Sequence, residues 1–157
     1  MADAAVAGED GNVAACADHE RTDRLRVLAL LDGRVADALN LGAQARHAGW
    51  NVDGHGAGAA AVRMSALAAR LGAHAELLAD RSIALGGAPC ATPERVFTRS
   101  CIPPLADESE PRVVEAMVER RVVRYIDALT ASAEVARELG DETTARLCGE
   151  LAASTRD

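Results

Sequence analysis

Two carboxylates four residues apart, Glu76 and Asp80, are the side chains of this sequence that we predict to bind a metal ion. Residues i and i+4 of a helix project from the same face, so both carboxylates would point in one direction. A pair without further ligands makes an open, weak site. The competing interpretation is a solvated helix face, on which the pair forms surface ion pairs with Arg81 or Arg70 worth under about 1 kcal/mol.

Four helices and one long connection are predicted to position these residues. Thr22 or Asp23 can cap the first helix, and Gly86 followed by Pro89 ends the second. Glycines near residue 50 predict a turn after the first helix. Apolar residues at helical spacing mark the helices, which are predicted over residues 22–48, 58–85, 109–140 and from 141 onward, with a short helix at 94–99 inside the connection 88–109. Connections that are short, long and short predict an all-α, up-down-down-up four-helix bundle with one long crossover.

The composition supports a single helical domain. The chain has 157 residues, 35 of them alanine, the strongest helix former. It contains three aromatic residues and no lysine. Residues 1–20 are acidic and lack periodicity, which predicts a flexible N-terminal tail, and residues 21–157 would form the bundle. An alanine core buries little apolar area, so association with further subunits is expected to add stability.

Charge and hydropathy exclude several classes of function. The net charge of −7 argues against general attraction to nucleic acids or anionic membranes. No apolar run approaches the roughly 20 residues that span a bilayer. The N-terminus lacks the basic and apolar regions of a signal peptide, so we expect a cytoplasmic protein.

Three ordered sequence anchors extend the pattern around the carboxylates. Residues 50–54 read WNVDG, and residues 74–89 follow the pattern H-x-E-x-x-x-D-R-x-x-x-L-G-G-x-P. Residues 96–102 and the string GDETTARL at 140–147 complete the set. Together they resemble the Dps proteins, the DNA-protection-during-starvation branch of the ferritin-like superfamily, over residues 28–150. The chain could instead be an alanine-rich bundle unrelated to ferritins. We favour this interpretation least, because it does not explain the order of the anchors.

The resemblance implies an iron site shared between two subunits. In the family, one subunit contributes two histidines and an aspartate, and the other an aspartate and a glutamate, which suit iron. The histidine positions correspond here to Gly49 and Ala61, and the aspartate of the same side to Ser65. The acidic pair is kept with its members exchanged, as Glu76 and Asp80. The expected ferroxidase activity is therefore weak or lost.

Other histidines are poor replacements for the missing ligands. His47 lies two residues before the ligand position, about 200° around the helix. His55 falls in the predicted turn and is expected to be solvent-exposed, although a loop could bring it near the site. His74 is expected to pack beside Leu71 and Leu78 rather than bind iron, and His19 is expected to be inert.

The family also implies partners and a role. Dps proteins form cages of twelve subunits that oxidise ferrous iron with hydrogen peroxide, store it and protect against oxidative stress. We therefore expect a homo-oligomer, with a dodecamer as the family's form, weak iron binding, and no direct binding of DNA because the tail is acidic. The alternative is a non-catalytic structural subunit, or one that mixes with an intact paralogue. Arg146 replaces an acidic residue of the family's pore, although Asp141, Glu142 and Glu150 could offset its charge. The aromatic end of the family's last helix has no counterpart before Asp157, so weaker three-fold contacts are expected.

Overall fold

The computed structural model describes residues 6–53, 58–106 and 110–156, which form helices and connections and contain no strand. The predicted all-α class is confirmed. None of the described helices combines the length and apolar character needed to cross a membrane. The helices are α1 (Val6–Asp53), α2 (Gly58–Ala84), α3 (Pro93–Arg99), α4 (Pro111–Glu138) and α5 (Glu142–Arg156).

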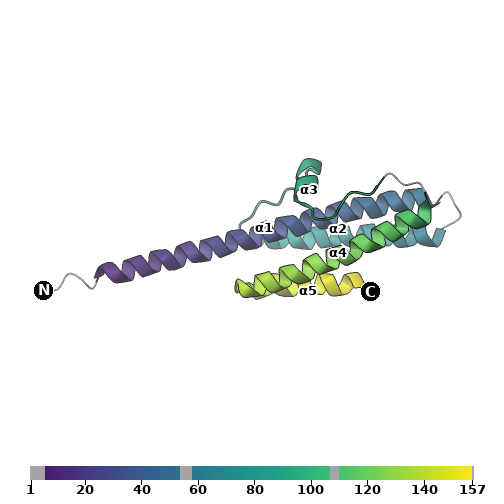
Figure 1. Ribbon diagram of the computed structural model, residues 1–157. Coiled ribbons are helices and arrows are strands. Elements are labelled where there is room, and N and C mark those ends of the chain that lie inside the picture. Colours follow the sequence, from purple (N-terminus) through teal and green to yellow (C-terminus); the bar gives the residue numbers. More distant parts are fainter. Residues whose placement is uncertain (1–5, 54–57, 107–109, 157) are drawn as a thin grey trace.

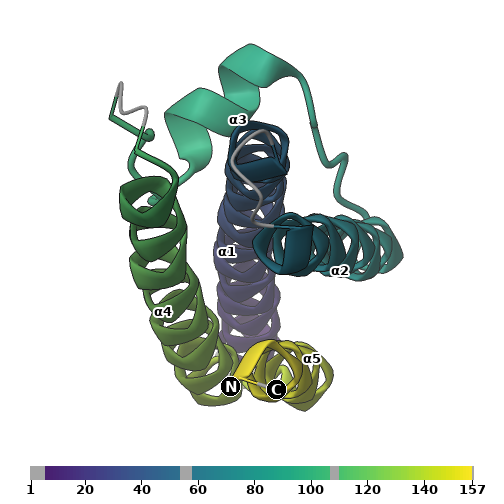
Figure 2. The same ribbon diagram turned by 90° about the vertical axis from the view of Figure 1, so that its right-hand side faces the viewer.

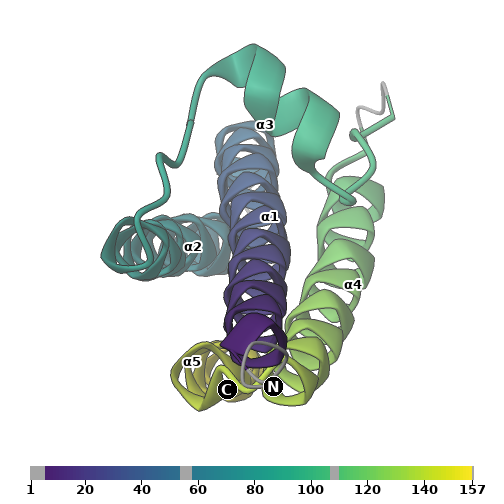
Figure 3. The same cartoon turned by 90° about the vertical axis from the view of Figure 1, so that its left-hand side faces the viewer.

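The helices form the predicted up-down-down-up bundle. α2 returns antiparallel to α1, α4 runs in the same direction as α2, and α5 returns along α4 (Figure 1). Viewed from its two ends, the bundle has α1 between α2 and α4, and α5 lies next to α4 (Figures 2 and 3). The short α3 lies on the outside of α1, within the crossover that links α2 to α4. This order of connections is that of the ferritin-like bundle.

The core combines large leucines with small alanines. Small side chains let α1 and α2 approach closely: a Cβ atom added to Gly42 would lie 3.5 Å from the Cβ atom of Leu71. The completely buried core residues are Leu31, Ala38, Leu41, Ala45, Ala48, Leu71, Leu78, Val118, Tyr125, Leu129, Ala136 and Cys148. They come from all four long helices, so the bundle has a single continuous core.

Glycine ends two of the helices as predicted. Gly86 and Gly140 have φ angles of +80° and +77°, in the left-handed region that favours glycine. The amide that follows Gly86 donates to the carbonyl of Ser82 at 2.9 Å, which closes the last turn of α2. α4 begins with Pro111 in its first turn, also as predicted, whereas Ser109, its predicted opening residue, lies outside the described residues.

The first helix is longer than predicted at both ends. It begins at Val6 rather than at Thr22 or Asp23, and it ends at Asp53, so residues 49–53 are helical instead of part of a turn. The hydroxyl of Thr22 donates to the carbonyl of Asp18 at 2.8 Å, a bond made inside a helix rather than at its cap. The alanine-rich stretch before Thr22 contains no proline to stop the helix. The flexibility of residues 1–20 stays a prediction.

Polar side chains hold the crossover against the bundle. Asn40 and Gln44 of α1 each donate to a crossover carbonyl at 2.9 Å, and the Gln44 bond goes to Pro103. From α4, the buried guanidinium of Arg121 donates to the carbonyls of Pro103 and Pro104 at 3.0 and 2.7 Å. The crossover is therefore fixed to both helices that it spans.

Candidate metal site

The predicted metal ligands Glu76 and Asp80 are both exposed on α2. Neither carboxylate has a hydrogen bond or ion pair with any described residue. The arginines expected to pair with them are engaged elsewhere: Arg81 binds Asp141 at 2.8 Å, and Arg70 donates to a backbone carbonyl of α5 at 2.7 Å. The pair therefore does not form the ion pairs expected with these arginines, although its exposure agrees with the solvated helix face of the competing interpretation. Both carboxylates face solvent and are available to a cation.

The three positions without ligands, Gly49, Ala61 and Ser65, lie together on the facing sides of α1 and α2. A Cβ atom added to Gly49 would lie 3.6 Å from the Ser65 hydroxyl and 3.7 Å from the Ala61 carbonyl oxygen. Gly49 is buried, Ala61 half-buried and Ser65 exposed. The three positions adjoin one another, as positions that share a metal ion must. The only possible ligand among their side chains is the hydroxyl of Ser65.

The two groups of positions lie far apart within one chain. Ser65 and Glu76 are 11 residues apart on α2, which at about 1.5 Å per residue separates them by roughly 17 Å. One metal ion cannot contact both groups in the same chain. In the described part of the chain, no three histidine, cysteine, aspartate or glutamate side chains gather closely enough to hold a metal ion.

His47 and His19 both lie on α1 next to a polar residue of the same helix. His47 is exposed, and its ring lies 3.3 Å from the side-chain amide of Asn51, whereas Gly49 is buried against α2. It therefore faces away from the ligand positions, as predicted. His19 lies 3.3 Å from Asp23 on the surface of α1. His55 lies outside the described residues.

His74 is a buried, hydrogen-bonded histidine, which confirms its predicted packing role. Its Nδ1 lies 3.4 Å from the Tyr125 hydroxyl and its Nε2 lies 3.2 Å from the Ser154 hydroxyl. The ring stacks on Tyr125 with centroids 6.1 Å apart. Burial, and then the charge of Arg70, lower the pKa of His74 below its usual 6.5, so the ring is neutral near pH 7.

The lowered pKa of His74 predicts a loss of stability on acidification. The unfolded chain takes up the His74 proton near pH 6.5 and the folded chain only at lower pH, so the free energy of unfolding should fall as the pH drops below 6.5. One such group contributes at most about 1.4 kcal/mol per pH unit. His74→Gln keeps a polar group for Tyr125 and Ser154 but cannot titrate. Urea unfolding between pH 5 and 7.5 should show a flatter pH dependence for this variant, and parallel curves for both proteins would contradict the assignment.

A second buried polar cluster, which sequence reasoning missed, joins α1 to the crossover. The carboxylate of Asp37 is fully buried and accepts hydrogen bonds from the Ser100 hydroxyl at 2.8 Å and the Cys101 amide at 2.6 Å. Its other oxygen pairs with Arg34 at 2.8 Å and accepts from the Cys101 thiol at 3.3 Å. All these atoms are engaged with one another, so the cluster is structural. The only signal in the sequence is a charged pair three residues apart beside an apolar stripe.

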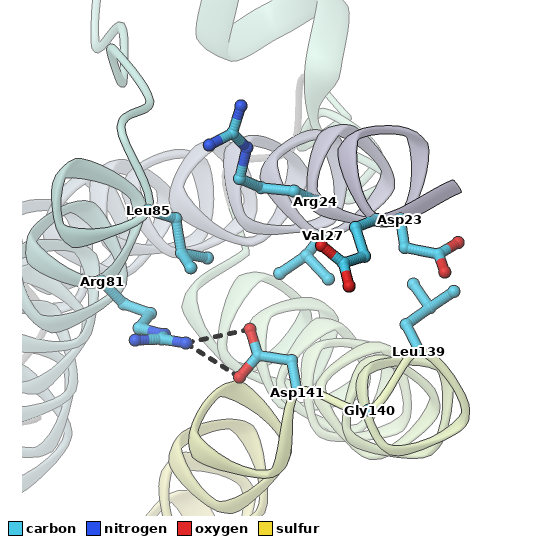
Figure 4. Close-up of a pocket in the computed structure, with 9 residues that line it drawn as sticks. Asp23, Arg24, Val27, Arg81, Leu85, Leu139, Gly140 and Asp141 are labelled. Carbon is cyan, nitrogen blue, oxygen red and sulfur yellow. Dashed lines mark hydrogen bonds and ion pairs between the residues drawn. The ribbon is translucent and has the colours of Figure 1, made fainter. Parts of the chain in front are cut away.

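The start of α5 carries the Asp141 cap predicted from the sequence. Asp141 accepts from the amide and hydroxyl of Thr144 at 2.9 and 2.7 Å. Arg81 donates to both carboxylate oxygens of Asp141 at 2.8 and 3.0 Å (Figure 4). Burial acts to raise the pKa of Asp141, but the hydrogen bonds from Thr144 and Arg81 outweigh it and lower that pKa. Asp141 is thus committed to fixing α5 against α2.

The acidic residues expected to offset Arg146 are all paired with arginines. Arg146 lies 4.0 Å from Glu150 on the surface of α5, and Glu142 lies 3.7 Å from Arg137. Asp141 is held by Arg81. Glu150 is therefore the acidic side chain that offsets the charge of Arg146 directly.

Comparison with known proteins agrees with this fold. The family model described as a ferritin-like domain matches residues 28–156. No curated protein matches the sequence. Among solved structures, Dps from Bacillus brevis has a TM-score of 0.80 at 24% identity, with 86% of this chain and 91% of that chain covered. Dps from Thermosynechococcus elongatus has a TM-score of 0.81 at 22% identity, with 87% of each chain covered.

An archaeal Dps homologue from Halobacterium salinarum has a TM-score of 0.80 at 25% identity, covering 87% of this chain and 76% of that chain. The family model spans most of the chain, and the helix order is the one that defines the bundle. The chain belongs to the ferritin-like family, and its fold is that of the Dps proteins.

Proposed function

We propose that the protein is a Dps-type mini-ferritin that binds iron weakly through Glu76 and Asp80 and oxidises it slowly. The observation that carries the proposal is the state of this pair: both carboxylates are exposed, four residues apart on α2, and unpaired among the described residues. Hard oxygen ligands of this kind suit iron. The empty cluster at Gly49, Ala61 and Ser65 supplies no imidazole, so the activity is expected to be low.

The exposed face of α2 supports a homo-oligomer. Val62 and Ile83 are 69% and 59% exposed, Leu77 is also exposed, and exposed alanines lie between them. An exposed apolar stripe along a helix marks a surface for association. Two copies packed antiparallel along α2 would bring Ser65 of one copy toward Glu76 of the other, so the two groups of positions would meet. A closed cage of twelve subunits is the arrangement that we propose.

The alternative function is that of a non-catalytic cage subunit. It is favoured by the side chains at Gly49, Ala61 and Ser65, which leave one half of a shared site without ligands. In a mixed cage, an intact paralogue would supply the histidines that face Glu76 and Asp80 of this chain. Such a subunit would contribute a carboxylate half-site and depend on its partner for iron oxidation.

The proposed protection against oxidative stress acts through iron rather than through DNA. The net charge of −7 and the absence of lysine disfavour contacts with phosphates. Ferrous iron that is bound by the protein is withheld from reaction with peroxide in free solution. We propose that this takes place in the cytoplasm.

Iron binding and oxidation by the purified protein test the proposal. Ferrous iron is added anaerobically, peroxide follows, and ferric absorbance is recorded. Wild type should exceed the protein-free rate only slightly, and Glu76→Gln with Asp80→Asn should remove that excess and reduce the iron bound per subunit. The matched control is Glu134→Gln with Glu138→Gln, because these residues are also exposed and four apart on one helix, α4. Equal losses in both double variants would reduce the effect to surface charge and reject the site.

A further inference from the structure

A groove of about 430 Å³ lies between α2, α4 and α5, away from the candidate metal ligands. Of the helices that line it, α5 has 15 residues, whereas α2 has 27 and α4 has 28. Figure 1 shows that α5 stops well before the end of the bundle at which α2 and α4 begin. The groove is lined by residues of α2 and α4 next to the last turn of α5.

The floor of the groove is apolar. Met64 of α2 is buried, and Leu67 of α2 and Val122 of α4 are partly buried along the same surface. Each belongs to the core or packs against it, so the floor is held by the bundle and does not depend on a loop. A floor of this kind favours an apolar group over water.

The rim of the groove is predominantly basic. Three arginines from two helices line it, Arg63, Arg70 and Arg156, against one carboxylate, Glu119. Arg63 is neutralised by an ion pair with Glu115 across the groove. Arg156 has no partner among the described residues, and Arg70 uses one nitrogen to hold the carbonyl of Ser154.

Arg70 has no ion-pair partner among the described residues. With one nitrogen bound to Ser154, the remaining guanidinium donors of Arg70 are open to an oxyanion. Two unneutralised arginines above an apolar floor are complementary to an anion that carries an apolar body.

We propose that this groove binds a small amphiphilic organic anion, a carboxylate or sulfonate attached to an apolar group. Arg156 and Arg70 bind the oxyanion, and the apolar group lies on Met64, Leu67 and Val122. An inorganic anion would leave the apolar floor in contact with water, and a cation would meet the arginines. The site does not depend on iron or on Glu76 and Asp80, so it goes beyond the function proposed above.

Binding of 8-anilinonaphthalene-1-sulfonate, followed by its fluorescence and by displacement with decanoate, tests the site in the full-length protein. Arg156→Gln should weaken binding about tenfold, the loss expected for one charge-assisted hydrogen bond. Glu119→Gln should tighten binding about two- to threefold, because it removes the one opposing charge. Arg146→Gln is the matched control on the same helix outside the groove, and it should leave binding unchanged.

Opposite signs for the Arg156 and Glu119 variants are the result that a general effect on folding would not produce. Arg156 is exposed and has no partner among the described residues, so its replacement should leave the circular dichroism spectrum intact. The proposal is overturned if Arg156→Gln and Arg146→Gln behave alike. It is equally overturned if decyltrimethylammonium displaces the probe as well as decanoate does, or if no displaceable binding is seen.

Discussion

Gly49→His, Ala61→His and Ser65→Asp, introduced together, are expected to accelerate iron oxidation by about tenfold or more. The three changes add imidazole and carboxylate ligands to a cluster whose positions already adjoin, and metal centres are sensitive enough that even outer-shell changes alter affinity about 10–100-fold. The first change meets no obstacle at its Cβ atom, which would lie 3.4 Å from the Cβ atom of Met64, an ordinary contact. Ferric absorbance after addition of ferrous iron and peroxide measures the gain.

Removing the carboxylates of Glu76 and Asp80 tests whether this gain in rate comes from a site shared between subunits. In a chain that also carries Glu76→Gln and Asp80→Asn, the added histidines should give little or no acceleration. Mixing that chain with wild-type subunits before assembly should restore part of the rate, because wild-type carboxylates would then face the new imidazoles. A rate that stays high without Glu76 and Asp80 would show that the two groups of positions do not cooperate.

Asp37→Ala is expected to destabilise the protein by about 3–5 kcal/mol, the range for breaking one side of a buried ion pair. The side chain of Arg34 is only 16% exposed and would lose its counter-ion. The Ser100 hydroxyl and the Cys101 amide would lose their acceptor at the same time. Urea unfolding followed by circular dichroism, at one fixed protein concentration, gives the change in free energy.

Asp32→Ala is the matched control for this effect. Asp32 is on the same helix and also pairs with an arginine. Its partner is Arg99 of α3, and this pair is longer, at 3.8 Å, and more exposed. Its loss should cost less than about 1 kcal/mol. A second variant, Arg34→Leu with Asp37→Ala, removes both buried charges and should recover part of the lost stability. Similar losses for Asp32→Ala and Asp37→Ala would show that burial does not strengthen the inner pair.

The bundle could be predicted largely because its boundaries are set by local backbone chemistry. Gly86 and Gly140 adopt left-handed conformations that few other residues accept, and both end helices at the predicted positions. The start of α1 was missed for the opposite reason. Asp18, Thr22 and Asp23 have the residue types of helix caps, yet the alanine-rich sequence before them continues the helix, and no local signal distinguishes these two outcomes.

Spacing within one helix could be read from the sequence, whereas side-chain contacts between different helices could not. Glu76 and Asp80 could be paired from their spacing alone. The buried pair of Arg34 and Asp37 has a spacing that is equally common on helix surfaces, and its burial depends on other segments that pack on α1, the crossover among them. The basic groove brings Arg70 and Arg156 together from different helices, and no local pattern encodes this proximity.

The hydrogen bonds from Arg121 to the crossover limit which residues can replace arginine at this position. Pro103 and Pro104 have no amide hydrogens, and their adjacent carbonyls are both bound by one planar guanidinium that also reaches a carbonyl of its own helix. Lysine carries a single nitrogen and cannot span three acceptors in a plane. Arginine and lysine can interchange over much of an exposed surface during evolutionary drift, but at this position the exchange would break hydrogen bonds that hold the crossover to α4.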